Sequence, residues 1–116
     1  MLIENRGDDN ILVLEVQERR FTASNVPDFK QFMRQTIRDH HEGVVLDLSS
    51  VEFMDSSGLG SLVSVARMMG GKNSLRVVCP HGAVRDLFRL TRMDQAFAIF
   101  DSVEAARAGQ NQVLSG

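Results

Sequence analysis

The chain has 116 residues, of which 43% are apolar and 24% charged, and its formal net charge is −2. These values predict one globular domain with a core of its own, and they exclude the strongly basic surface of a general binder of nucleic acid or anionic membranes. Apolar runs fall well short of the ~20 residues that a membrane-spanning helix needs, and the N-terminus lacks the pattern of a signal peptide, so we expect a cytoplasmic protein.

The first elements predicted are two strands joined by a tight turn. LIENR (2–6) alternates weakly between apolar and polar residues, as an edge strand would. GDDN (7–10) is a turn signal, and ILVLEV (11–16) is a short apolar run rich in β-branched residues. Together these segments predict a hairpin.

A helix and a buried strand follow. Ser24 and Asn25 can cap a helix, and Pro27 is tolerated in its first turn. Apolar residues then recur at helical spacing, and the helix should run to about Asp39: Val26, Phe29, Met33 and Ile37. VVLDL (44–48) is nearly all apolar, which is typical of a strand that is covered on both faces.

The second half of the chain repeats this alternation. From Ser56 the pattern is helical until Gly70 and Gly71, with one apolar face: Leu59, Leu62, Val63, Ala66 and Met69. LRVVC (75–79) predicts a central strand and a buried, unreactive thiol at Cys79. A helix around residues 84–91, a short strand AFAIF (96–100) and a last helix in DSVEAARA (101–108) complete the pattern.

The predicted order is therefore ββαβαβαβα, within one domain of residues 1–108 and a flexible tail of residues 109–116. Strands that alternate with helices indicate an α/β fold with a mostly parallel central sheet of four to five strands and about four helices. Sites in such folds favour the carboxyl ends of the strands. The segment FMDSSGLG (53–60) lies at such a junction.

Two interpretations of the serines in this segment remain open on the sequence alone. Asp55 or Ser56 can simply cap the helix that follows. A serine in the first helical turn can also carry a phosphate, since the unpaired N–H groups and the partial positive charge there suit an anion. Gly58 and Gly60 would allow another backbone to approach closely.

Catalytic and ligand-binding alternatives are weaker. Met54 stands where a nucleophile elbow needs glycine, and neither a phosphate-binding loop nor a dinucleotide fingerprint occurs. We interpret His40, His41 and His81 as exposed or structural residues. Asp47 stands at the end of a strand, where receiver domains have a phospho-accepting aspartate. Such domains also use an acidic pair and a later lysine, but Glu15 and Glu18 are a poor acidic pair and Lys72 lies in a helix-ending loop. We expect no catalytic residue, no metal and no cofactor.

The segment VVLDLSSVEFMDSSGLGSLVSVARMM (44–69) resembles the core of a STAS domain, and in particular the free-standing bacterial anti-sigma factor antagonists. Their hallmark is an apolar strand ending in an acid, a short turn, and then F-[ML]-D-S-[ST]-G-[LI] at the start of a helix. FMDSSGLG matches it throughout, and the resemblance covers about residues 2–108.

The resemblance implies a phospho-regulated binding protein rather than an enzyme. Ser56 would be phosphorylated by an anti-sigma factor that is also a serine kinase, and a metal-dependent serine phosphatase would remove the phosphate. The unphosphorylated form would bind the anti-sigma factor and release its target regulator. The residues expected to contact this partner lie in two segments: Asp55, Ser56, Ser57, Gly58 and Leu59, and Thr22, Ser24 and Asn25. A monomer is expected, with no direct contact to nucleic acid.

One segment departs from the family. Relatives often have a Gly-x-Leu-Asp motif before the first helix, whereas this chain has Thr22 at the aligned position, which can replace part of the capping role but not the charge. The alternative function is a constitutive STAS interaction module, such as a soluble subunit of a lipid-transporting ABC system, which would need no phosphoserine.

Overall fold

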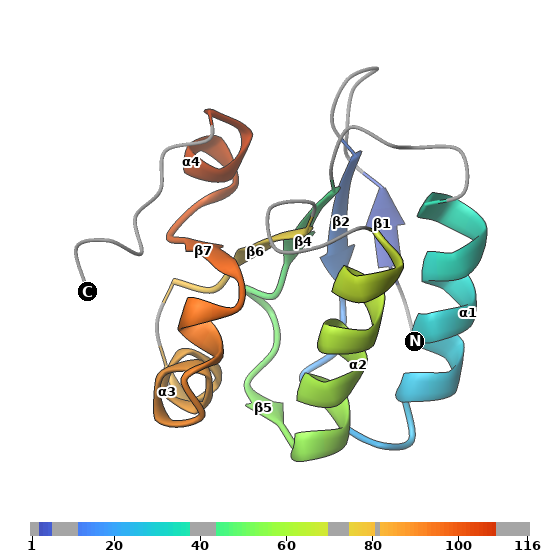
Figure 1. Ribbon diagram of the computed structural model, residues 1–116, viewed down its shortest axis with the longest axis horizontal. Coiled ribbons are helices and arrows are strands. Elements are labelled where there is room, and N and C mark those ends of the chain that lie inside the picture. The colour runs from blue at the N-terminus through green and yellow to red at the C-terminus, as the bar shows by residue number, and fades with distance from the viewer. Residues whose placement is uncertain (1–2, 6–11, 38–43, 70–74, 81, 109–116) are drawn as a thin grey trace.

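The computed structural model describes residues 3–5, 12–37, 44–69, 75–80 and 82–108 (Figure 1). The predictions that concern other residues lie outside the described part of the chain: the GDDN turn, the end of the first predicted helix at Asp39, His40, His41, Gly70, Gly71, Lys72, His81 and the tail 109–116.

The central sheet has five strands in the spatial order β1-β2-β4-β6-β7. They are β1 (Ile3–Asn5), β2 (Leu12–Val16), β4 (Val44–Asp47), β6 (Leu75–Val78) and β7 (Ala98–Phe100). β1 lies at one edge and pairs antiparallel with β2, and the remaining pairs are parallel. The mostly parallel sheet and the antiparallel pairing of the first two strands are therefore confirmed.

Helices cover both faces of this sheet, as Figure 1 shows. They are α1 (Val26–Ile37), α2 (Ser56–Met68), α3 (Ala83–Leu90) and α4 (Val103–Ala108), with a short 3-10 helix η1 (Met93–Gln95) before β7. Leu12 and Leu14 of β2 pack in the larger core cluster with α1, α2 and α3, whereas Val13 packs in the smaller cluster with α4. This division follows from the alternation of side chains along a strand.

A second, two-stranded parallel sheet lies outside the central one. It consists of β3 (Arg20–Phe21) and β5 (Phe53–Met54), with Arg20 opposite Phe53 and Phe21 opposite Met54. The sequence pattern predicted neither strand, because two residues show no periodicity. This small sheet places the chain before α1 beside the chain before α2.

The last predicted strand begins later than expected. Residues 93–95 form η1, and the backbone N–H groups of Ala96 and Phe97 donate to the Met93 carbonyl, so β7 starts only at Ala98. Cys79 follows the end of β6 and is buried, as predicted.

Candidate functional site

Asp55 is the N-cap of α2. Its backbone is extended (φ −97°, ψ −179°), and its carboxylate Oδ1 accepts a hydrogen bond of 2.8 Å from the backbone N–H of Gly58. The structure thereby separates the two candidates for the cap, because residue 55 holds the extended backbone that a cap requires and Ser56 is already the first residue of the helix.

Ser56 and Ser57 are both exposed in the first turn of α2. Because Asp55 caps the helix, the hydroxyl of Ser56 is not needed for this purpose, and no described residue bonds it. The first turn of α2 contains no acidic residue. A phosphate on Ser56 would therefore meet the favourable end of the helix dipole, together with repulsion from one carboxylate, that of Asp55.

Gly58 packs α2 tightly against β3. A Cβ atom at this position would lie 2.5 Å from the carbonyl oxygen of Phe21 and 3.0 Å from Cγ of Met54. Both distances are shorter than ordinary contacts, so only glycine lets the first turn of the helix approach the strand this closely. Gly60 is different, because a Cβ there would have no neighbour within 4 Å.

The loop between β3 and α1 is fixed to the same cap. The second carboxylate oxygen of Asp55, Oδ2, accepts a hydrogen bond of 3.2 Å from the backbone N–H of Ala23. Within the loop, the Asn25 side chain accepts from the backbone N–H of Thr22 at 2.9 Å, and the hydroxyls of Thr22 and Ser24 are 3.1 Å apart. The two segments that were expected to form one surface are therefore adjacent.

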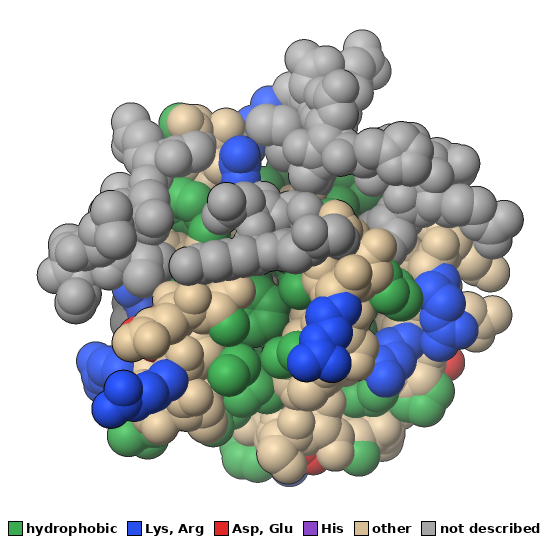
Figure 2. All heavy atoms as spheres, in the orientation of Figure 1, with side chains coloured by type: hydrophobic (Ala, Val, Ile, Leu, Met, Phe, Trp, Pro, Cys, Tyr) green, Lys and Arg blue, Asp and Glu red, His purple; other side chains and the backbone are tan. Residues whose placement is uncertain are grey.

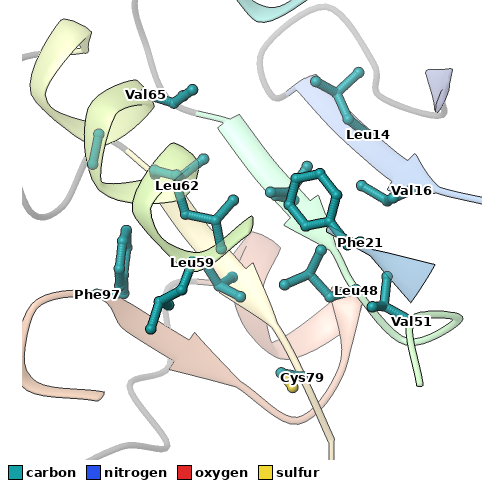
Figure 3. Close-up of a cluster of buried hydrophobic side chains, with 14 of the residues drawn as sticks. Leu14, Val16, Phe21, Leu48, Val51, Leu59, Leu62, Val65, Cys79 and Phe97 are labelled. Carbon is teal, nitrogen blue, oxygen red and sulfur yellow. The ribbon is translucent and has the colours of Figure 1, made fainter. Parts of the chain in front are cut away.

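Leu59 does not belong to the exposed part of this surface. Only 7% of the residue is exposed, and its side chain points into the larger core cluster together with Leu62 and Val65 (Figure 3). The helical spacing that placed Leu59 on the apolar face of α2 also explains this burial. Gly58 is buried as well, so the exposed positions at the start of α2 are Ser56, Ser57 and Gly60.

The carboxyl edge of the central sheet contains other polar groups. Asp47 is buried, and its carboxylate accepts hydrogen bonds from both the backbone N–H and the hydroxyl of Ser49. The Ser50 hydroxyl donates to Glu15 at 3.1 Å. These contacts tie the end of β4 to the turn after it and leave Asp47 enclosed.

Cys79 is buried just after the end of β6, and its surroundings make the thiol unreactive. Burial raises the pKa of the Cys79 thiol from its ordinary 9.0 to about 11; the nearby Arg85 guanidinium opposes this shift and the Asp47 carboxylate adds to it. Since the thiolate is the nucleophilic form, a thiol with this pKa is inert near neutral pH.

Two further properties concern metals and membranes. Across the described segments, no group of three or more His, Cys, Asp or Glu side chains could hold a metal ion. None of the described helices combines the length and apolar character that a membrane crossing requires.

The model of the STAS domain family matches residues 3–106, which is nearly the whole described chain. The chain belongs to the STAS domain family. The order of strands and helices described above is therefore the STAS fold, as the resemblance in the sequence predicted.

The chain is also similar to individual proteins and to solved structures. The chain is 29% identical over 75 residues to the anti-sigma-F factor antagonist RsfB of Mycobacterium tuberculosis, a match that covers 65% of this chain and 62% of RsfB. The crystal structure of an anti-sigma factor antagonist from Mycobacterium paratuberculosis superposes with a TM-score of 0.83 at 25% identity, covering 93% of this chain and 92% of that one. The phosphorylated form of the Bacillus protein SpoIIAA shares the fold, with a TM-score of 0.65 at 15% identity over 94% of this chain and all of SpoIIAA.

Two features of the site were not foreseen from the sequence. One is the hydrogen bond from Ala23 to Asp55, which joins residues 32 positions apart. The other is the side chain of Arg20, whose guanidinium carbon lies 4.5 Å from the centre of the Phe53 ring. The exposed aromatic residue in the FMDSSG segment was the available signal for the second feature, but its partner depends on the β3–β5 pairing.

Proposed function

We propose that this STAS protein is an anti-sigma factor antagonist whose partner binding is switched by phosphorylation of Ser56. The observation that carries the proposal is the exposed Ser56 at the first residue of α2, next to a cap that Asp55 supplies without it. The similarity to RsfB and to other anti-sigma factor antagonists supports the same assignment.

The partner in this proposal is an anti-sigma factor with serine kinase activity, and a metal-dependent serine phosphatase reverses the modification. The protein is their substrate and performs no catalysis itself. We place it in the cytoplasm as a monomer, with the STAS domain in residues 1–108. Contacts come from the cap and first turn of α2 and from the loop of Thr22, Ser24 and Asn25, while the side chain of Leu59 remains in the core.

Charge is sufficient to operate this switch. An exposed, neutral serine can be covered by a partner at little cost if it is hydrogen-bonded. A phosphate adds about −1.5 to −2 charges beside the Asp55 carboxylate, and covering these two anions is unfavourable unless the partner supplies cations. A loss of only ~2.7 kcal/mol weakens binding about a hundredfold.

The test combines intact mass with site mapping of the protein isolated from its own cells and capture experiments with two variants. We expect a species heavier by about 80 Da, the mass of a phosphoryl group, with the phosphate on Ser56. Ser56→Ala should lose the modification and retain the kinase, whereas Ser56→Asp should bind it about a hundredfold more weakly. Ser64→Ala is the control, because Ser64 lies in the same helix but beyond its first turn, and it should be phosphorylated normally.

A different result would support the alternative function. If no phosphate is present under several growth conditions, and the Ser56→Ala chain captures an ABC-type ATPase in place of a kinase, the protein is a constitutive STAS module and Ser56 is only a helix residue. Tight binding of the kinase by Ser56→Asp would show that charge does not operate the switch.

A further inference from the structure

The outer face of the small β3–β5 sheet carries an exposed aromatic ring. Phe53 is 43% exposed, and the Arg20 guanidinium lies over its ring at 4.5 Å. Their neighbours along the two strands, Phe21 and Met54, are buried. Arg20 and Phe53 therefore form the side of this sheet that faces away from the core.

A hollow of about 310 Å³ lies at these residues, lined by Arg19, Arg20, Glu52 and Phe53. The backbone fixes its shape, because the N–H groups of Glu52 and Phe53 both donate to the Arg19 carbonyl, at 2.8 and 3.1 Å. The hollow is lined by an aromatic ring, a guanidinium and an ion pair. Such a lining suits one apolar side chain of a partner with polar groups around it.

The two arginines that line the hollow differ in their contacts. Arg19 forms an ion pair with Glu52 at 3.3 Å. Arg20 contacts the Phe53 ring, and no carboxylate of the described residues pairs with it. A guanidinium that lies over an aromatic ring can still donate hydrogen bonds from its N–H groups to a carboxylate.

This hollow lies close to the proposed phosphorylation site along the chain. Arg20 pairs with Phe53 in the β3–β5 register, and Asp55 and Ser56 follow Phe53 by two and three residues. The hydrogen bond from the Ala23 N–H to the Asp55 carboxylate joins the two chain segments just after strands β3 and β5. Figure 1 shows β5 leading directly into the start of α2.

We propose that the Arg20–Phe53 stack is a docking point for an acidic segment of the partner kinase, and this inference rests on the proposed function. A carboxylate of the partner pairs with the Arg20 guanidinium, and an adjacent apolar side chain fills the hollow that Phe53 helps to line. The Arg20–Phe53 contact then supplies affinity close to Ser56 and is not itself modified.

The test measures binding of the purified kinase, captured with the Ser56→Ala chain, to unphosphorylated variants by calorimetry. We expect Arg20→Glu to weaken binding about 30-fold or more and Phe53→Ala about tenfold or more, as for buried anchor residues. Arg34→Glu and Leu90→Ala are the matched controls, since Arg34 is exposed on α1 and Leu90 is 80% exposed at the end of α3, and both should bind within threefold of the wild type. Thermal unfolding checks that every variant is folded.

Charge rescue identifies the carboxylate. Each acidic residue of the kinase that cross-links to a photoreactive phenylalanine analogue at position 53 is changed to arginine, and one such variant should restore binding to Arg20→Glu. A photoreactive residue at position 90 serves as the control for non-specific cross-linking.

The outcomes separate the two proposals. A captured kinase that binds Arg20→Glu as tightly as the wild type overturns the docking point and leaves the switch at Ser56 intact. The absence of a cross-link at position 53 above the level at position 90 overturns it as well. If the Ser56→Ala chain captures an ABC-type ATPase and no serine kinase, both the proposed function and the assignment of the partner fail.

Discussion

Gly58 and Gly60 lie two residues apart in α2 and have opposite surroundings. A Cβ atom at Gly58 would lie 2.5 Å from a backbone oxygen, whereas one at Gly60 would meet nothing within 4 Å. We expect Gly58→Ala to lower the free energy of unfolding by about 1–3 kcal/mol, because β3 or the helix must shift. Gly60→Ala should raise it by about 0.5–1 kcal/mol, since alanine is the better residue inside a helix.

Urea unfolding of the two variants beside the wild type measures this difference. The pair controls for the substitution itself, because both changes add one methyl group to the same helix. Equal stability of the two variants would show that the first turn of α2 is not packed tightly against Phe21.

Cys79 makes the stability depend on pH in the alkaline range. The pKa of its thiol is about 11 in the folded chain and 9.0 ordinarily, so the unfolded chain loses the proton first as pH rises. The stabilisation is complete below pH 9 and is lost between pH 9 and pH 11, with a slope of up to about 1.4 kcal/mol per pH unit.

The free energy of unfolding measured in urea between pH 7 and pH 11 tests this prediction, with Cys79→Ala as the control. The variant should decline less steeply than the wild type above pH 9, although a small cavity lowers its stability throughout. Parallel curves for the two proteins would exclude the thiol as the cause.

At the scale of the elements, Asp55 connects α2 to the loop before α1. One carboxylate oxygen accepts from Gly58 and the other from Ala23. Asp55→Ala should lower the free energy of unfolding by about 1 kcal/mol, as the loss of an N-cap does. Asp55→Asn should retain the cap but not the second bond, because asparagine has a single acceptor oxygen.

Amide hydrogen exchange distinguishes these variants. The amide of Ala23 should exchange faster in both, whereas that of Gly58 should exchange faster only in Asp55→Ala. Unchanged exchange at Ala23 in both variants would mean that the loop is held by its internal bonds among Thr22, Ser24 and Asn25.

The sequence predicted the features of the site that depend on neighbouring residues in the chain, but not those that depend on contacts between separate elements. The FMDSSG segment located the helix start, because hydroxyl and acidic residues before an apolar helical face are typical of an N-terminus. Ser56 as the proposed acceptor came from the family resemblance and not from the spacing. Whether Asp55 or Ser56 is the cap depends on the backbone at residue 55, for which both side chains are suitable. The β3–β5 pairing and the contacts of Arg20 depend on a strand pair of two residues each, which is too short for any periodicity.

At the scale of the whole molecule, the proposed switch at Ser56 requires no refolding. Ser56 lies on the surface at the end of a helix, and the central strands β2, β4 and β6 are covered on both faces by the two core clusters. We expect Ser56→Glu to change the stability by less than about 1 kcal/mol, because attraction to the helix dipole and repulsion from Asp55 oppose each other.

Amide chemical shifts and exchange of Ser56→Glu test this prediction. Shift changes should be confined to residues 22–25 and 53–58, and the amides of the three central strands should remain the slowest to exchange. Faster exchange throughout the sheet would indicate that the added charge acts on the fold rather than on the surface.

The overall architecture was largely predictable because its signals are local and repeated. Apolar runs of four to six residues alternate with helical patterns, and this alternation indicates a parallel sheet whatever the exact bounds. The start of β7 was placed too early, since the N–H groups of Ala96 and Phe97 donate to the Met93 carbonyl, a contact that the apolar pattern of AFAIF does not indicate. The spatial distribution of charge was not predictable: Figure 2 shows Lys and Arg side chains in separate groups over α1, α2 and α3 with apolar side chains between them, an arrangement that a net charge of −2 does not suggest.

The small sheet of β3 and β5 has a consequence for the proposed phosphorylation of Ser56. The surface around Ser56 is made by residues 19–25 and residues 52–58, which the β3–β5 pairing and the Ala23–Asp55 hydrogen bond bring together in the folded domain. A short synthetic peptide that contains FMDSSGLG would present the serine without its neighbours. Under the proposed function, unrelated proteins that contain Asp-Ser-Ser by chance would be poor substrates, because recognition would depend on the folded domain and not on the short sequence alone.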